Sequence, residues 1–472
     1  MRAIFLIVIF LISVLSISAQ HILVPPYLQP GNASTFAKEQ KVVIWETDSV
    51  PATFTVTFHL KGDAAKIQHA KIQHIPLQLQ GKTTRLYRAT LPDLRFDTVY
   101  TYEVKYRDSV VTRASFSTRT KKQHTRFAVL GDFGAGTTQQ GYIAHQLFLQ
   151  KPQFVLSTGD NVYQDGLASE YRKNLFPFYN ADKNDPTKGA MLMNTIPFYM
   201  VLGNHDVRSD NLDKYPDGLA YFYYNDLPLN APLSAFACKV SGSTERVKAF
   251  KKNTKPRFPR ISNFSFDYGN IHFICLDAND YVNPLEPMMV DWIKRDIKAS
   301  KAQWKIVTFH QPGFNSSASH YDAQIQRLLS PLFESLEVDL VLTGHVHNYQ
   351  RSLPLKFIPE RNETGDQYAI SPEGRVNGVF TLDTTFDGIT DTTPEGIIYI
   401  VTGAGGNALY DMKISEKPEK WQHEPKENWV PFTKKLISHI HSFTFIETNG
   451  KTLDLQQIDL YGNVIDRIRV TK

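Results

Sequence analysis

Cysteine is nearly absent from this chain. Among its 472 residues only two occur, Cys238 and Cys275. Two thiols can form at most one bridge, so hydrophobic cores rather than a disulfide framework must hold the fold together. Cys275 lies in the apolar stretch IHFICLDAND, which is typical of a buried strand, where free thiols are common. The sequence leaves open whether the two cysteines are bonded.

A strong excess of charge is missing as well. The formal net charge is +5, with 21% charged and 42% apolar residues, and the charges are spread along the chain. This composition is typical of a folded globular protein and does not imply a nucleic-acid partner. The length suggests two or three domains, and the oligomeric state stays open.

Long apolar runs are limited to the N-terminus, MRAIFLIVIFLISVLSISAQ. Its apolar part covers roughly fourteen residues, fewer than the about twenty that a membrane span needs. One arginine and small residues near Ala19 predict a signal peptide over 1–19, and hence a secreted or periplasmic protein. No cysteine at the junction could carry a lipid, so no membrane attachment is expected after cleavage; an uncleaved signal anchor is the alternative.

Residues 22–118 alternate apolar and polar positions in short runs such as KVVIWETD and ATFTVTFHL. Short strands separated by turn signals predict a small antiparallel sandwich. The run DTVYTYEVKY resembles a late strand of a fibronectin type III domain. We therefore expect an all-β, fibronectin type III-like N-terminal domain, followed by the polar linker TKKQHTR.

From residue 125 to 472 the pattern changes to short apolar runs that end in polar residues, for example FAVLGD, FVLSTGD and LVLTGH. Such runs suit strands covered on both faces, and the segments QQGYIAHQLFLQK and PMMVDWIKRDIKAS have helical spacing, so an α/β domain is predicted. Residues 207–262, which include the basic run RVKAFKKNTKPRFPR, and residues 352–396 look like long loops. The basic run predicts a solvated loop, with attraction of anionic substrate as the alternative.

Metal-ligand residue types follow five of these strand-like runs in order: Asp132, Asp160 and Tyr163, Asn204, His310, and finally His345 and His347. Ligands of open α/β sheets gather beyond the carboxyl ends of the strands. Each residue alone is weak evidence, but their joint occurrence predicts a metal site. Two ions about 3.5 to 4 Å apart need a shared ligand, and Asp160 is the natural bridge. Phenolate and carboxylate favour a hard trivalent ion, so Tyr163 indicates ferric iron.

The blocks DFG, GDNVY, GNHD, VTFH and GHVH resemble those of purple acid phosphatases, a branch of the binuclear metallophosphoesterases. The resemblance implies a metallophosphoesterase β-sandwich flanked by helices. It places Asp132, Tyr163 and His347 on Fe(III), Asn204, His310 and His345 on a divalent Fe, Zn or Mn, and Asp160 between the ions. It also implies a metal-bound hydroxide as the nucleophile that attacks phosphorus.

Two further histidines match substrate-side positions of that family. His205 follows Asn204 and resembles the histidine that contacts phosphate and protonates the leaving group, while His320 in HQPGFNSSASH resembles another. Ser319 stands where many members have an adjacent histidine, and Gln350 where glutamate is frequent. His272 and Asp277 match no ligand block and are predicted to be structural.

The leading prediction is therefore an exported acid phosphatase that hydrolyses small phosphate monoesters. The same ligands would also serve a phosphodiesterase or nucleotide pyrophosphatase. A protein Ser/Thr phosphatase fits less well, because the sequence near Asp160 lacks an arginine-containing block and has Tyr163 instead. A non-catalytic binding protein is the alternative of a different class, but no candidate ligand is missing.

Overall fold

The computed structural model describes residues 21–50, 52–79, 81–410 and 430–472. The predicted signal peptide, 1–19, lies outside these residues. Within the described part, no helix is long and apolar enough to cross a membrane.

Two four-stranded antiparallel sheets form the N-terminal layers, with strand orders β1-β2-β6-β5 and β4-β3-β7-β8. Trp45 stacks on Tyr87 at 5.1 Å between ring centroids, inside the apolar core that the two sheets share. The N-terminal sheets are therefore those of a β-sandwich. Their strands are β1 (Ile22–Gln29), β2 (Lys41–Thr47), β3 (Phe54–Leu60), β4 (Gln68–His69), β5 (Lys71–Leu79), β6 (Lys82–Leu91), β7 (Val99–Tyr106) and β8 (Ser109–Ser117).

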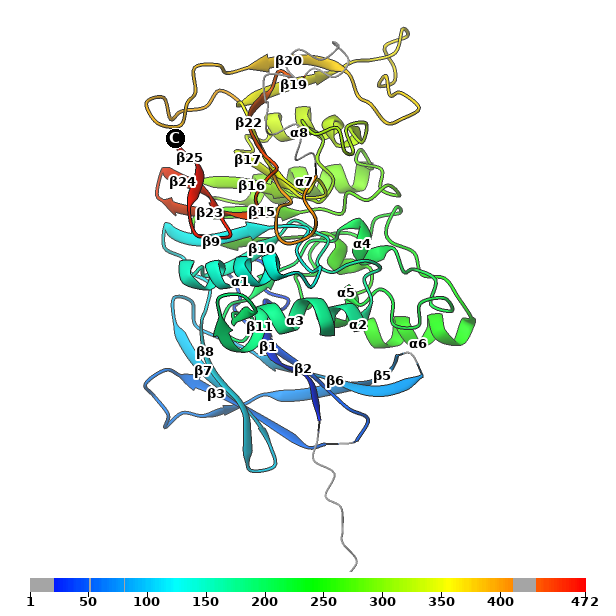
Figure 1. Cartoon of the computed structure of the whole chain (residues 1–472), viewed down its shortest axis with the longest axis vertical. Coiled ribbons are helices and arrows are strands. Elements are labelled where there is room, and N and C mark those ends of the chain that lie inside the picture. Colours follow the sequence, from blue (N-terminus) through cyan, green and yellow to red (C-terminus); the bar gives the residue numbers. More distant parts are fainter. Residues whose placement is uncertain (1–20, 51, 80, 411–429) are drawn as a thin grey trace, which may run out of the picture.

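Two larger mixed sheets follow, and they pack face to face in the middle of the molecule (Figure 1). Phe127 of the first sheet meets Phe273 of the second edge to face at 5.3 Å. In the first sheet, of order β13-β10-β9-β23-β24-β25, the strands are β9 (His124–Leu130), β10 (Phe154–Ser157), β13 (Phe198–Tyr199), β23 (Ser442–Asn449), β24 (Thr452–Asp459) and β25 (Val464–Thr471).

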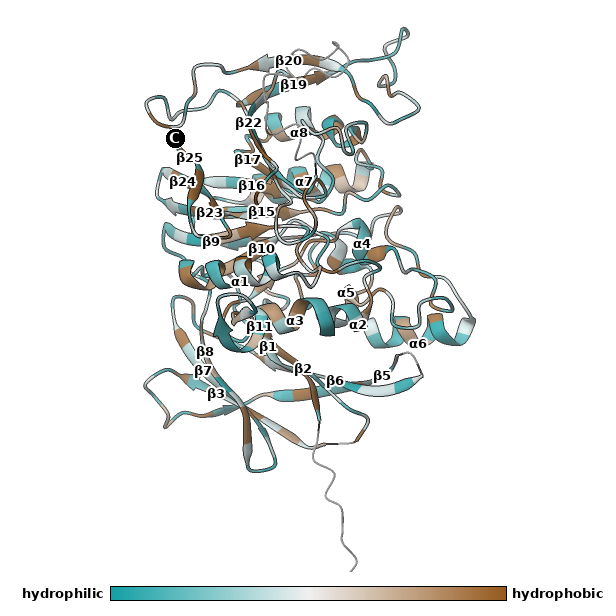
Figure 2. Ribbon diagram, viewed as in Figure 1, coloured by the Kyte–Doolittle hydropathy of each residue, from teal (hydrophilic) through white to brown (hydrophobic). Residues whose placement is uncertain are grey.

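The second sheet has the order β14-β15-β16-β17-β21-β18-β22. Its strands are β14 (Phe264–Tyr268), β15 (Ile271–Cys275), β16 (Trp304–Thr308), β17 (Leu340–Thr343), β18 (Tyr349–Ser352), β21 (Ile398–Thr402) and β22 (Thr433–Ile437). Strands β15, β16, β17 and β21 run parallel, as do β9, β10 and β13. In Figure 2 much of the length of these central strands is brown, the colour of apolar residues.

Helices cover the outer faces. Helix α1 (Thr138–Gln150) packs Ile143 and Leu147 into the core of the first sheet, and α7 (Pro287–Ala299) packs Trp292 and Ile293 against the second. The remaining helices are short: α2 (Ala168–Glu170), the π-helical turn η1 (Tyr171–Leu175), α3 (Phe176–Tyr179), α4 (Asn204–Val207), α5 (Tyr221–Tyr224), α6 (Thr244–Thr254), the 3-10 turns η2 (Arg260–Ser262) and η3 (Ile325–Leu329), and α8 (Ser330–Ser335). Two packed sheets flanked by helices are the architecture that the resemblance predicts for this part of the chain.

The two segments predicted to be long loops contain regular structure. The basic run forms α6, because Phe250 packs against Tyr223 and Phe258 while the lysines on the other side stay exposed. Residues 352–396 contain a hairpin of β19 (Leu355–Pro359) and β20 (Gly378–Leu382). A separate hairpin, outside these two segments, is formed by β11 (Asn180–Asp185) and β12 (Gly189–Met191). Sequence composition missed these elements, since a single buried face over few residues leaves a weak periodic signal.

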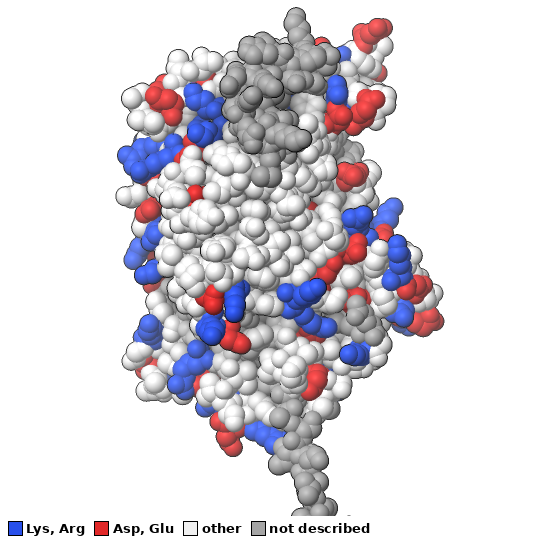
Figure 3. Space-filling model, in the orientation of Figure 1, with Lys and Arg blue, Asp and Glu red and all other residues white. Residues whose placement is uncertain are grey.

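Both cysteines are free and buried. On the face shown in Figure 3, acidic and basic groups are mixed near the edges and the middle is largely uncharged.

Candidate metal centre

All seven predicted ligands lie just beyond the carboxyl ends of strands. Asp132 follows β9, and Asp160 and Tyr163 follow β10. Asn204 follows β13, His310 follows β16, and the two closely spaced histidines follow β17. Because β9, β10 and β13 are parallel, and β16 and β17 are also parallel, these ends meet at one edge of the two sheets.

One group of donors is enclosed. The hydroxyl of Tyr163 donates to Asp132 Oδ1 at 2.9 Å and lies 3.2 Å from His347 Nε2. His347 Nε2 is 3.4 Å from the same carboxylate oxygen. At most 4% of each of these three residues is exposed. A carboxylate, a phenol and an imidazole thus converge in a buried space.

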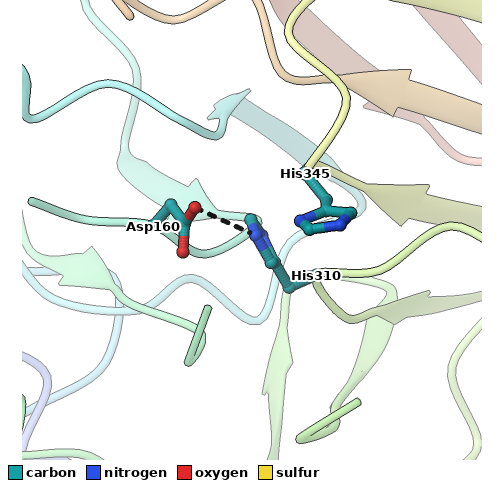
Figure 4. A group of neighbouring side chains, drawn as sticks. All are labelled: Asp160, His310 and His345. Atoms are coloured by element: carbon teal, nitrogen blue, oxygen red, sulfur yellow. Dashed lines mark ion pairs between the residues drawn. The ribbon is translucent and has the colours of Figure 1, made fainter. Parts of the chain in front are cut away.

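The second group is more open. Asp160, His310 and His345 each offer one donor atom, and these atoms lie within 4.8 Å of one another (Figure 4). Asp160 Oδ2 is 3.3 Å from His310 Nε2, and Asn204 Oδ1 is 3.1 Å from the same nitrogen. Asn204 and His345 are partly exposed, unlike the residues of the first group.

The donor spacing fits bound ions. Two atoms that bind one ion at about 2.1 Å, at angles between square and tetrahedral, are separated by about 3.0 to 3.4 Å. The separations of 2.9, 3.2 and 3.4 Å in the enclosed group lie close to this range, as do those around His310. His310 Nε2 also comes within 4.0 Å of Asp132 Oδ1, so the two groups are contiguous. The residues present therefore fit two adjacent ions.

Backbone strain occurs at several of these positions. Asp132, Asp160 and His345 have φ values of 59°, 50° and 67°, in the left-handed region that non-glycine residues rarely adopt. His320 joins them at 59°. Strain of this kind typically costs about 1 to 3 kcal/mol per residue and clusters at functional sites, where the surrounding structure holds it.

Glycines beside the ligands allow close approach. A Cβ on Gly203 would lie 2.2 Å from Asp160 Oδ1, and one on Gly159 would lie 2.5 Å from His310 Nδ1. Gly159 also has a φ of 99°. Any larger residue at either position would displace a ligand, which explains the glycines that end these apolar runs.

Backbone carbonyls orient the imidazoles. His310 Nδ1 lies 2.7 Å from the carbonyl oxygen of Thr158, and His347 Nδ1 lies 2.6 Å from that of Ala408. A carbonyl can only accept, so both Nδ1 atoms carry the proton and both Nε2 atoms face the donor groups. Metal-binding histidines are typically held in this way.

The charges of the cluster are interdependent. Burial alone would lower the pKa of His310, but the carboxylates of Asp160 and Asp132 outweigh it and raise that pKa to about 9. Burial would raise the pKa of Asp160, yet His310, His205 and His345 lower it. Burial, with the nearby Asp132 and Asp160, raises the pKa of the Tyr163 phenol well above its usual range. Ionisation of that phenol consequently calls for a strongly charged cation.

The two predicted substrate-side histidines lie at the open side. His205 Nε2 is 3.9 Å from Asp160 Oδ2, and its Nδ1 is 2.5 Å from the carbonyl oxygen of Gln164. The exposed ring of His320 packs against His345 with centroids 4.1 Å apart. Burial, then the positive field of His347, lowers the pKa of His320.

Sequence reasoning missed the loop after β21. Its residues surround the enclosed group: Asn407 N donates to the Asp132 carbonyl at 3.0 Å, and the Tyr410 ring stacks on His347 at 3.9 Å. The signal was available, because GAGGN follows an apolar strand as the ligand blocks do. Asp206 was missed too; it accepts hydrogen bonds from Gly203 N at 2.9 Å and Asn161 Nδ2 at 2.8 Å.

The residues that depart from the family pattern have defined partners. Gln350 donates to the side chains of Asn315 and Asn348, both at 2.9 Å, and accepts from Ser316 N at 2.6 Å. Its amide therefore supports the segment that leads to His320. His272 pairs with Asp267 and Asp296, and Asp277 accepts from Tyr281, so neither contributes to the donor groups described above.

Comparison with known proteins gives this site a family context. Residues 125–349 match the calcineurin-like phosphoesterase family model. The chain is 25% identical to purple acid phosphatase 23 of Arabidopsis thaliana over 319 residues, which cover 62% of this chain and 56% of that one. It is 29% identical to purple acid phosphatase 17 of the same plant over 49% of this chain and 66% of the relative.

A phosphoenolpyruvate phosphatase of Allium cepa is 25% identical over 80% of this chain and 72% of its own length. The chain thus spans between about half and three quarters of these relatives. The structure of a purple acid phosphatase from yellow lupin seeds superimposes with a TM-score of 0.62 at 16% identity, covering 94% of this chain and 74% of that one. This structural similarity shows that the two proteins share a fold.

Proposed function

Since this chain carries a calcineurin-like phosphoesterase domain and is related to purple acid phosphatases, we propose that it is an exported acid phosphatase that hydrolyses small phosphate monoesters. One observation carries the proposal. An enclosed group with a phenol adjoins an open group with an amide, since His310 Nε2 of the open group lies within 4.0 Å of Asp132 Oδ1, and both groups lie at a strand-end edge where ligands gather. The two groups differ in hardness, as ions of unequal charge require.

The donor sets suggest which residues hold which ion. Asp132, Tyr163 and His347 would hold Fe(III), whereas Asn204, His310 and His345 would hold a divalent Fe, Zn or Mn, with Asp160 shared. When bound, such ions polarise the phosphate and lower the pKa of water to generate the nucleophile. The domain division that we propose is 22–118, fibronectin type III-like, and 125–472, with a signal peptide over 1–19.

In this proposal His205 delivers a proton. The Gln164 carbonyl fixes its Nδ1, so Nε2 faces the open side of Asp160. A partly exposed imidazole at this position can donate to the oxygen that leaves phosphorus. His320 lies beyond His345 on the same open side and would contact the leaving group. Its neighbour Ser319 offers a hydroxyl where a second imidazole is common in the family.

Elemental analysis of the purified full chain, combined with a substrate panel, tests the proposal. We expect two metals per chain, at least one of them iron, and faster hydrolysis of monoesters than of diesters and nucleotides. One zinc and no iron would contradict the metal assignment. If bis-aryl diesters or nucleoside triphosphates are hydrolysed faster than monoesters, the protein is a phosphodiesterase or a nucleotide pyrophosphatase instead. A chain that binds metal but hydrolyses none of these substrates would favour a binding protein.

A further inference from the structure

The boundary between the N-terminal sandwich and the metallophosphoesterase layers contains a fully buried carboxylate. Glu46, on β2, has no exposed surface. It accepts hydrogen bonds from Arg172 Nε at 3.0 Å and Nη2 at 2.6 Å, and from Tyr224 Oη at 2.7 Å. Thr84 of the neighbouring strand β6 donates to it as well, at 2.5 Å. A residue of the sandwich is thus hydrogen-bonded to two elements across the boundary, η1 through Arg172 and α5 through Tyr224.

Arg172 belongs to the π-helical turn η1, and two other residues of this turn contact loops near the metal centre. The hydroxyl of Tyr171 donates to Asp206 Oδ1 at 3.4 Å. Asn174 Nδ2 donates to the carbonyl oxygen of Tyr163 at 3.1 Å. Arg172 therefore points toward Glu46, while Tyr171 and Asn174 of the same turn contact the loops that carry candidate ligands. Turns of this rare type frequently occur at functional sites.

Those contacts reach both donor groups. Asp206 binds the Gly203 and Asn161 amides, and these residues directly adjoin Asn204 and Asp160. Just before η1, the Glu170 carboxylate accepts from the backbone N–H groups of Gln164, Asp165 and Leu167. It thereby holds the loop whose Gln164 carbonyl orients His205.

The space between Glu46 and these loops is tightly packed. The Tyr171 and Tyr224 rings lie 5.1 Å apart, and Phe176 contacts Tyr224 at 5.3 Å. Tyr27 of β1 donates to the Tyr224 carbonyl at 2.6 Å. All four rings are buried. A close-packed interior transmits a displacement rather than absorbing it.

We propose that Glu46 is a positioning residue for the metal centre: through Arg172 it fixes η1, and through η1 the loops that carry Asp160, Tyr163 and His205. The sandwich would then have a role in catalysis without touching substrate. The positioning of the loops by Glu46 does not depend on the proposed function. Only the identity of what these loops bind, two metal ions, rests on it.

The test compares two substitutions at one boundary in the full-length chain. Glu46→Gln removes the charge that faces Arg172. Asp226→Asn is the matched control. Asp226 pairs across the same boundary with Arg88 at 3.4 Å and lies 3.9 Å from Arg257, and no hydrogen bond or ion pair joins it to η1 in the described part of the chain. Hydrogen exchange in metal-free protein is measured for residues 160–167 and 203–206, and Zn²⁺ and Fe³⁺ affinities are measured by competition with chelators.

We expect Glu46→Gln to speed exchange in both loops and to weaken metal binding by about tenfold or more, the lower end of what partners behind metal ligands contribute. Asp226→Asn should leave both readouts as in wild type even where it lowers thermal stability. Arg172→Lys, which keeps the charge but loses the two-pronged geometry, should act in the same direction as Glu46→Gln and serves if that variant fails to fold.

Equal changes in the Glu46 and Asp226 variants, or unchanged exchange and affinity in the Glu46 and Arg172 variants, would overturn the inference. A wild-type chain that binds no metal would refute the proposed function instead. The exchange comparison uses metal-free protein, so it would still decide whether Glu46 positions the loops.

Discussion

Both ring nitrogens of His272 face carboxylates. In the candidate metal centre, by contrast, His310 and His347 each direct Nδ1 at a backbone carbonyl oxygen. His272 Nδ1 is 2.7 Å from Asp267, and its Nε2 is 3.2 Å from Asp296, the second pair lacking hydrogen-bond geometry. His310 instead gives its Nδ1 to the Thr158 carbonyl. Both clusters combine histidine with aspartate in the same layers, yet their chemistry differs.

This contrast separates an ion pair from a candidate metal site. A ring between two carboxylates is stabilised as the cation, and neither of its nitrogens has a lone pair to offer. A ring that donates its Nδ1 proton to a neutral carbonyl keeps Nε2 directed at an ion. Because burial of His310 is outweighed by the Asp160 and Asp132 carboxylates, which raise its pKa to about 9, an ion that binds there displaces the Nε2 proton. The metal centre adds strained ligands such as Asp160, which the His272 cluster lacks.

The largest effect is expected at Asp160, the carboxylate that we propose both ions share. Asp160→Asn leaves one oxygen and no negative charge, so on this proposal neither ion would keep its common ligand. We expect metal content to fall below one ion per chain after dialysis, and hydrolysis to fall by more than the about 10²- to 10⁴-fold that loss of a proton donor costs. Asp296→Asn is the control from the other cluster and should retain metals and activity. Full metal occupancy in Asp160→Asn would refute the shared role.

Substitution of His205 separates proton transfer from metal binding. His205→Ala should keep both ions, because the main-chain N–H that donates to Asp160 Oδ1 at 2.8 Å is preserved. Turnover of alkyl phosphates should fall by about 10²- to 10⁴-fold. Aryl phosphates, whose leaving groups need little protonation, should lose much less. Equal losses for both classes would assign His205 to phosphate binding rather than to protonation.

Tyr163→Phe probes the enclosed group alone. It removes the hydroxyl that lies 2.9 Å from Asp132 and 3.2 Å from His347, while the fold should persist. We expect the visible charge-transfer band of the iron protein to disappear and ferric affinity to fall by at least about 10- to 100-fold. Tyr179→Phe is the control, because the Tyr179 ring packs on Phe133 beside Asp132 at 5.3 Å while its buried hydroxyl has no hydrogen-bond partner among the described residues. A band that survives in Tyr163→Phe would place the site in another binuclear branch.

The sequence alone predicted the fold class. It also predicted that the candidate residues lie close together, because each follows an apolar run and parallel strands end at one edge of a sheet. It could not predict which groups orient them. The Thr158 and Gln164 carbonyls and the Asn407 amide act through the main chain, which the side-chain pattern does not encode. Helix α6 was missed for a related reason: its burial depends on Tyr223 and Phe258, which come from outside the helix.

The smallest effect is expected at His272, where only stability should change. Burial would lower its pKa, but the Asp267 and Asp296 carboxylates outweigh burial and raise the pKa from 6.5 to about 9. Because the folded-state pKa lies above that of the unfolded chain, the stabilisation is complete below about pH 6.5 and is lost as pH rises through about 9. A pKa difference of this size corresponds to at most about 3 kcal/mol.

His272→Asn should therefore lower the thermal midpoint near pH 6, and its deficit relative to wild type should shrink steadily between pH 6.5 and 9. Metal content and turnover should match wild type throughout, since both ring nitrogens already face carboxylates. A deficit that stays constant from pH 6 to pH 10 would mean that His272 acts through packing rather than charge. Loss of metal in this variant would instead show that the two clusters are coupled, and the distinction between carbonyl-held and carboxylate-held histidines would not separate metal sites from ion pairs in this fold.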